Sequence, residues 1–127
     1  DPMLEAGLRQ QTDYYSTVRT QMAKSIEETL AQMAAQVRAL KERRTCVLLV
    51  SLPIDPSLER LPLSLHMHAR AKEVLGGTGA GWLEIVNDGS FRTVDSIHLA
   101  SDDARRVSAI VAGAVHSRAA CERASAR

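Results

Sequence analysis

An aspartate and a histidine three residues apart are the feature of the sequence with the clearest chemical potential. They lie in the segment Asp95-Ser96-Ile97-His98-Leu99. Histidine has an ordinary pKa near neutrality, and a nearby carboxylate can bond one ring nitrogen and leave the other as a base. Such a pair can activate a hydroxyl group. The D-x-x-H spacing is short and also arises by chance, so a surface histidine beside a turn aspartate is the alternative interpretation.

The elements expected around this segment place it where reactive groups collect. Residues 82–86 predict a strand, and the Asn-Asp-Gly sequence at 87–89 predicts the turn that ends it. Ser101 can cap a final helix that carries Asp102 and Asp103 in its first turn, near the positive end of the helix dipole. In open sheets, sites form beyond the carboxyl ends of strands, so the D-x-x-H segment lies at an expected position.

The preceding part of the chain predicts a long helix, a strand and a shorter helix. Residues 13–43 lack Gly and Pro and repeat apolar side chains every three or four residues, which is typical of an amphipathic helix. The apolar run at 46–50 predicts a buried strand, 53–62 a proline-rich loop, and 63–75 a helix ended by glycines. This order predicts a right-handed parallel crossover and an α/β class. Because only two strands are identified, another chain, a missing segment or self-association is expected to complete the sheet.

Composition limits the class of protein. The 127 residues are expected to form one domain, 1–127. A net charge of +1 and 3% aromatic residues argue against nucleic acid as a partner. No apolar run approaches the roughly 18 residues that a membrane span needs, and the N-terminus lacks the layout of a signal peptide. We therefore expect no transmembrane segment, and localisation stays open because a mature secreted protein would look the same.

The two cysteines, Cys46 and Cys121, are too far apart for a zinc or redox motif, so we predict no metal and no cofactor. Helices that cover a parallel sheet run antiparallel to its strands, which brings the end of the last helix near the start of the first strand. A Cys46–Cys121 disulfide and two separate buried thiols are both compatible with the sequence. A disulfide would indicate a secreted or extracytoplasmic setting.

Four other tempting features have simpler interpretations. His66 and His68 are two residues apart on a predicted helix, which places them on different faces and argues against a metal site. Ser51 lacks the Gly-x-Ser-x-Gly elbow of a nucleophilic serine. His116 lies late in the last helix, where a cation is favourable. The glycines at 76–81 lead from helix to strand, the reverse of a phosphate-binding loop.

The D-x-x-H segment, followed by a helix rich in small residues, resembles the last conserved block of the SGNH, or GDSL, hydrolase family. The order of long helix, strand ending in Ser-Leu-Pro, loop, helix and strand starting at Trp82 is similar to that family's second half. The resemblance implies a three-layer αβα fold with a flavodoxin-like parallel sheet, incomplete in this chain. It also implies a serine ester hydrolase or O-acyltransferase that acts on an acyl ester, with Asp95 orienting His98 and His98 as general base.

The sequence departs from that family in the parts that supply the nucleophile. No Gly-Asp-Ser segment, no block glycine and no Gly-x-Asn-Asp segment precede the long helix, and Ser96 stands where the family commonly has glycine. The resemblance places Asp1-Pro2 close behind the asparagine block. The serine and the oxyanion donors are therefore expected from a missing segment or a companion chain.

Two hypotheses from other classes remain. The chain can be a non-catalytic interaction module in which the long helix pairs with a partner, and the D-x-x-H turn is incidental. It can also be an inactive relic of the hydrolase fold.

Overall fold

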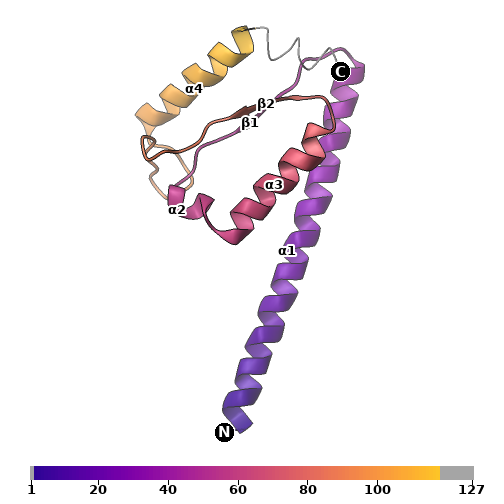
Figure 1. Ribbon diagram of the computed structural model, residues 1–127, viewed down its shortest axis with the longest axis vertical. Helices are drawn as coiled ribbons and strands as arrows, with labels where there is room; N and C mark the ends of the chain where they lie inside the picture. Colours follow the sequence, from indigo (N-terminus) through magenta and orange to yellow (C-terminus); the bar gives the residue numbers. More distant parts are fainter. Residues whose placement is uncertain (1, 118–127) are drawn as a thin grey trace.

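The computed structural model describes residues 2–117, apart from the side chains of residues 11 and 15, and shows one long helix with a smaller body packed against one end (Figure 1). In chain order the elements are α1 (Pro2–Glu42), β1 (Leu48–Ser51), α2 (Pro56–Glu59), α3 (Pro62–Gly76), β2 (Gly81–Glu84) and α4 (Ser101–His116). The C-terminal half of α1 contacts α3, and its N-terminal half extends past every other element.

The expected three-layer αβα, flavodoxin-like fold is wrong. Helix accounts for 65% of the structure and strand for 9%. Within residues 2–117 the sheet has two strands, which pair in parallel with Leu48 opposite Gly81 and Ser51 opposite Glu84. A layered parallel sheet needs strands buried on both faces, whereas every residue of β1 is only half-buried. The parallel crossover through α3 was predicted correctly, but the sheet around it was not.

The helix α1 starts earlier than its apolar pattern predicts and ends where expected. It begins at Pro2, and proline suits the first turn because that position needs no amide donor. Thr12, just before the predicted start, lies inside the helix and donates its hydroxyl to the Leu8 carbonyl at 2.8 Å. At the other end Arg44 adopts a left-handed φ of 60°, and the Thr45 amide donates to the Leu40 carbonyl at 3.0 Å. This closing turn reverses the chain toward β1.

The hydrophobic core lies between the C-terminal half of α1 and α3. Leu30, Ala34 and Leu75 are its buried centre. Partly buried side chains complete it: Ile26, Leu49, Ala71, Val74 and Trp82. At the edge of this contact the Arg70 guanidinium donates to both carboxylate oxygens of Glu27, at 2.6 and 2.8 Å. One apolar seam and one bidentate ion pair thus hold α3 against α1.

The loop expected at 53–62 contains the short helix α2. Asp55 caps it, since its Oδ1 accepts from the Ser57 amide at 2.8 Å, and Pro56 occupies the first helical position. The prolines therefore start helices here rather than prevent them. The helix predicted at 63–75 matches α3, and the strands expected at 46–50 and 82–86 are displaced by one or two residues.

No helix among the described residues is long and apolar enough to cross a membrane. Cys46 is disulfide-bonded. Its expected partner, Cys121, lies outside the described residues, as does the tail at 118–127.

The core assignment predicts unequal effects for one substitution at two positions of α3. Leu75 is 3% exposed and Leu65 is 58% exposed. Leu75→Ala should lower the free energy of unfolding by about 2–4 kcal/mol, because it opens a cavity against Leu30 and Ala34. Leu65→Ala should cost less than about 1 kcal/mol. Urea unfolding followed by circular dichroism measures both, and equal losses would contradict this core.

Candidate functional site

The D-x-x-H segment forms a narrow turn between β2 and α4. Its two sides are bridged at Thr93 and Leu99 in antiparallel fashion. The Val94 amide donates to the His98 carbonyl at 2.8 Å, and the Ala100 amide donates to the Arg92 carbonyl at 2.8 Å. These bonds fix the width of the turn, so the backbone that carries Asp95 and His98 has a defined position.

Within this turn the Asp95 carboxylate contacts three donors. Its Oδ1 accepts from the His98 amide at 2.6 Å and from the Ile97 amide at 3.1 Å. Its Oδ2 lies 2.5 Å from Nδ1 of the His98 ring. The His98 amide contributes most to lowering the pKa of Asp95, the ring and the Ile97 amide add to it, and the pKa falls to about 2. The carboxylate is therefore charged at neutral pH and directed at one nitrogen of the imidazole.

The His98 ring is open to solvent on its other side. Its side chain is 76% exposed, and that of Asp95 is 51% exposed. With Nδ1 committed to the carboxylate, Nε2 is the nitrogen available as a base. Among the described side chains no hydroxyl is hydrogen-bonded to this ring. The described chain thus supplies an oriented base without a nucleophile.

Ser96 makes the turn at an unfavourable backbone conformation. Its φ is 71°, in the left-handed region where a side chain is strained and glycine is preferred. Its carbonyl accepts from the Asp55 amide at 2.9 Å, which joins the turn to the cap of α2. Ser96 therefore occupies a backbone conformation that would favour glycine.

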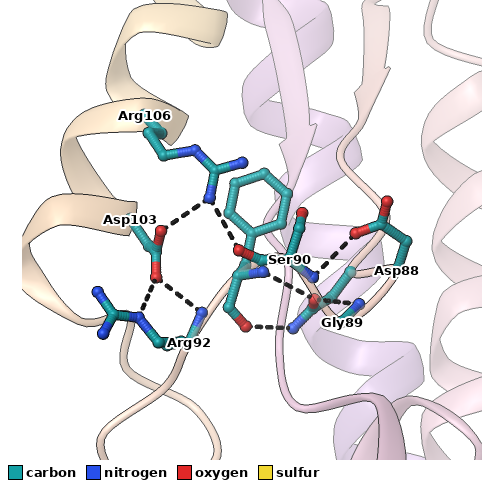
Figure 2. A network of polar contacts seen from close by, with 8 residues as sticks. Asp88, Gly89, Ser90, Arg92, Asp103 and Arg106 are labelled. Atoms are coloured by element: carbon teal, nitrogen blue, oxygen red, sulfur yellow. Dashed lines mark hydrogen bonds and ion pairs between the residues drawn. The ribbon is translucent and has the colours of Figure 1, made fainter.

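A buried carboxylate anchors the base of the turn to α4. The Asp103 side chain, only 6% exposed, accepts from the Arg92 amide at 2.8 Å and from Arg92 Nε at 3.3 Å (Figure 2). Its other oxygen accepts from Arg106 at 2.8 Å. The Arg92 amide is the main cause of the lowered pKa of Asp103, and Arg106 adds to it. Because the Arg92 carbonyl also accepts from the Ala100 amide, Asp103 sets where the turn leaves the body of the protein.

Arg106 extends the same network to the preceding loop. Its guanidinium donates to the Ser90 carbonyl at 2.8 Å and lies over the Phe91 ring, 4.5 Å from the ring centre (Figure 2). A cation over an aromatic face is attracted by the ring quadrupole. The loop before the turn is thereby held against α4 by a hydrogen bond and a ring contact.

Asn87 holds the other side of that loop. Its side chain is buried, and both its amide nitrogen and its amide oxygen are hydrogen-bonded. Nδ2 donates to the carbonyls of Ile54 and Phe91, both at 2.9 Å. Its Oδ1 accepts from the amides of Gly89 and Phe91, at 2.9 and 3.2 Å. A satisfied buried amide of this kind specifies one loop conformation.

The sequence predicted only local roles for Asn87 and Asp103, and not the contacts by which they hold the loop and the turn. Asn87 appears in a turn-forming Asn-Asp-Gly sequence, and Asp103 in the first turn of a helix. The spacing of Asp103 and Arg106 by three residues is the one sequence signal for an ion pair on that helix. The partner Arg92 is eleven positions away, and no local pattern links it to Asp103. Ser101, the expected cap, is the first helical residue, and Ala100 occupies the capping position without a side-chain bond.

A second imidazole and carboxylate meet between α3 and β2. His68 Nε2 lies 2.6 Å from one oxygen of Glu84, and Lys72 donates to the other at 3.0 Å. They border a groove of about 220 Å³ that Ser51 and Ser64 also line. Lys72 is the main cause of the lowered pKa of Glu84. Because Nε2 is occupied by the carboxylate and Lys72 shares it, this cluster is an ion-pair link between α3 and the strand.

The remaining sequence candidates do not join either cluster. Ser51 lies at the end of β1 and lines the groove near Glu84, and His66 lines a different groove beside Leu63. His116 lies in the last turn of α4, as predicted. Within the part of the chain that the structure describes, no group of three or more histidine, cysteine or acidic side chains could hold a metal ion.

The anchoring role of Asp103 predicts faster hydrogen exchange in one variant. Asp103→Asn replaces a carboxylate surrounded by donors with an amide that must turn its own NH2 toward one of them. The amides of Arg92 and Ala100 should then exchange at least about tenfold faster, because a satisfied buried bond is lost. Asp102→Asn is the control, since Asp102 is 74% exposed and bonds Arg105 alone. Equal exchange in both variants, measured by NMR, would refute the anchor.

The backbone of Ser96 predicts an order of thermal stability. Ser96→Gly should match or exceed the parent protein, because relief of the left-handed strain offsets the entropy of a freer unfolded chain. Ser96→Val should lower the melting temperature by at least about 3 °C, since a β-branched side chain fits this conformation worst. Differential scanning calorimetry measures the order. A valine variant as stable as the glycine variant would show that the turn lacks this conformation.

Comparison with known proteins returned no match. No family model, curated protein or solved structure matches the chain. The resemblance of the D-x-x-H segment to the SGNH block therefore remains a prediction, and the case for its chemistry depends on the geometry of Asp95 and His98.

Proposed function

We propose that Asp95 and His98 form the acid–base part of a serine ester hydrolase or O-acyltransferase site. The nucleophilic serine and the oxyanion donors come from another polypeptide segment. The bond of 2.5 Å between Asp95 Oδ2 and His98 Nδ1 is the observation that carries the proposal. In serine hydrolases of several folds a carboxylate bonds Nδ1 and the serine faces Nε2, and the contact between Asp95 and His98 matches the carboxylate part of that arrangement.

The reaction follows from the positions of the two ring nitrogens. His98 Nε2 accepts the proton of the serine hydroxyl while the serine oxygen attacks the acyl carbonyl carbon. The resulting imidazolium bonds the Asp95 carboxylate through Nδ1. It then returns the proton to the departing alcohol, which leaves an acyl-enzyme. Water or an acceptor alcohol attacks the acyl-enzyme by the same proton transfers in reverse order.

The exposure of the ring supports a nucleophile from elsewhere. A catalytic imidazole in a completed site contacts its serine and is shielded from bulk water, whereas the His98 side chain is 76% exposed. The turn itself is anchored by Asp103 and by the Asp55 amide, so an approaching segment meets a preformed base. An acyl ester of a carbohydrate or lipid is the substrate class that fits the family resemblance.

The direct test uses the polypeptide that contains this chain, together with any chain that purifies with it. His98→Ala should lower ester turnover by about 10³-fold or more, and Asp95→Asn should lower it by a similar order. His66→Ala is the matched control, since this exposed histidine lies on α3 and lines a separate groove. Near-normal turnover in His98→Ala would exclude the proposed base.

Labelling with a serine-directed fluorophosphonate separates the enzyme from its rivals. An assembled site should be labelled, and His98→Ala should abolish the labelling because the serine is no longer activated. Absence of labelling in the assembled parent protein would favour an interaction module or an inactive relic.

A further inference from the structure

The N-terminal half of α1 carries an apolar seam that the rest of the protein leaves uncovered. Leu4 is 67% exposed, Leu8 57% and Met22 41%. Figure 1 shows that this half of the helix extends away from α3 and the strands. Farther along the same helix, Ile26, Leu30 and Ala34 face α3 and form the core. The helix thus continues its apolar side beyond the point where the body ends.

The spacing of this seam reads the same in both directions. Its positions are Leu4, Leu8, Gln11, Tyr15, Val18 and Met22, separated by steps of four, three, four, three and four residues, and Gln11 is the one polar residue among them. Alternating steps of three and four are the pattern of helices that pair side by side. Because the order of steps is palindromic, two antiparallel copies centred on Asp13 bring Leu4 opposite Met22 and Leu8 opposite Val18.

The charges that flank the seam fit the same pairing. Glu5 and Arg19 each lie one residue after a seam position, so both occupy the same edge of the helix. In an antiparallel pair, equivalent edges face each other, and Glu5 of one copy lies near Arg19 of the other. Two-fold symmetry produces this opposite-charge contact twice. In the single chain Glu5 makes an exposed i,i+4 pair with Arg9 at 3.6 Å, which such a contact can replace.

A groove lies where the end of the second helix would fit. It measures about 800 Å³ and is lined by Met22 and Ala23 of α1 and by Leu61, Pro62 and Leu63 at the start of α3. In the antiparallel register Leu4 of the second copy lies beside Met22, at the mouth of this groove. The adjoining Met3 is 86% exposed and can enter it.

We propose that α1 pairs through residues 4–22 with the same segment of a second copy, antiparallel and two-fold symmetric. The N-terminus of each helix lies at the groove between α1 and α3 of the other copy. The pairing does not depend on the proposed ester chemistry, because neither Asp95 nor His98 contributes to it. It covers the exposed seam and gives the long helix a structural role.

Analytical ultracentrifugation of the 127-residue chain tests the pairing. The parent chain should show a monomer–dimer equilibrium. Leu8→Glu should raise the dimer dissociation constant by at least about tenfold, because a charge enters the apolar seam twice per dimer. Gln10→Glu adds the same charge on the opposite side of the helix and should leave the dissociation constant within about twofold. A chain that is monomeric throughout the micromolar range, or a dimer that Leu8→Glu leaves intact, would overturn the proposal.

A charge exchange tests the orientation. Glu5→Arg and Arg19→Glu alone should each weaken the dimer by about threefold or more, because each places like charges together twice. The double variant Glu5→Arg/Arg19→Glu should recover most of the affinity. Better helix formation cannot explain such a recovery. Glu5→Arg places two cations, at positions 5 and 9, one turn apart, and like charges at this spacing destabilise a helix. Far-UV circular dichroism checks the helix content. Failure of the double variant to recover would exclude the antiparallel register.

Discussion

The candidate site depends on the hydrogen bonds of the Asp95 carboxylate. They fix both the backbone of the turn and the direction of the His98 ring. Its Oδ1 accepts two backbone amides, and its Oδ2 contacts His98 Nδ1 at 2.5 Å. The amides and the ring favour the charged form and lower the pKa of Asp95 to about 2. Its contribution to stability is therefore present above the ordinary carboxyl pKa of about 4 and is lost as the pH falls through about 2. At neutral pH the Asp95 carboxylate is therefore charged and still orients the His98 ring.

This turn is exposed, so its position depends on buried polar groups behind it. Asp103 binds the Arg92 amide and Arg106, and Asn87 bonds the carbonyls of Ile54 and Phe91. Counted over the whole residue, Asp103 and Asn87 are each only 4% exposed. Buried polar groups that are fully bonded select one arrangement of the backbone around them. The chain thus combines a rigid support with an accessible imidazole. This combination suits a general base that contacts a serine hydroxyl from another polypeptide segment.

Local features and the parallel crossover were predictable from the sequence, whereas side-chain contacts between distant positions and the extent of the sheet were not. The periodicity of 13–43 predicted most of α1, glycines marked the end of α3, and the D-x-x-H spacing predicted the contact between Asp95 and His98. The start of α1 at Pro2 was missed, because the prediction rested on a segment without Gly and Pro, and Pro2 and Gly7 lie before that segment. The pairing of Arg92 with Asp103 was missed because it joins a loop to a helix across eleven positions. The three-layer sheet was inferred from resemblance, and the half-buried residues of β1 show why two short strands do not form one.

The exposed half of α1 and the exposed ring of His98 are separate consequences of a small core. The core centres on Leu30, Ala34 and Leu75 and covers one end of the long helix. The apolar side chains of the exposed half of α1 and the His98 ring lie outside this core and remain accessible to another polypeptide. The structure therefore presents a surface for helix pairing at one end and an oriented base at the other side of the body.

The tautomer of His98 tests the central claim most directly. Nitrogen-15 NMR of the ring, in the pH range where it is neutral, distinguishes a proton on Nδ1 from a proton on Nε2. If the Asp95 carboxylate orients the ring, the proton lies on Nδ1 and Nε2 has a free lone pair. In Asp95→Ala this preference should disappear. A parent protein with the proton on Nε2, or one whose ring is indifferent to Asp95, would contradict the proposed orientation of the base.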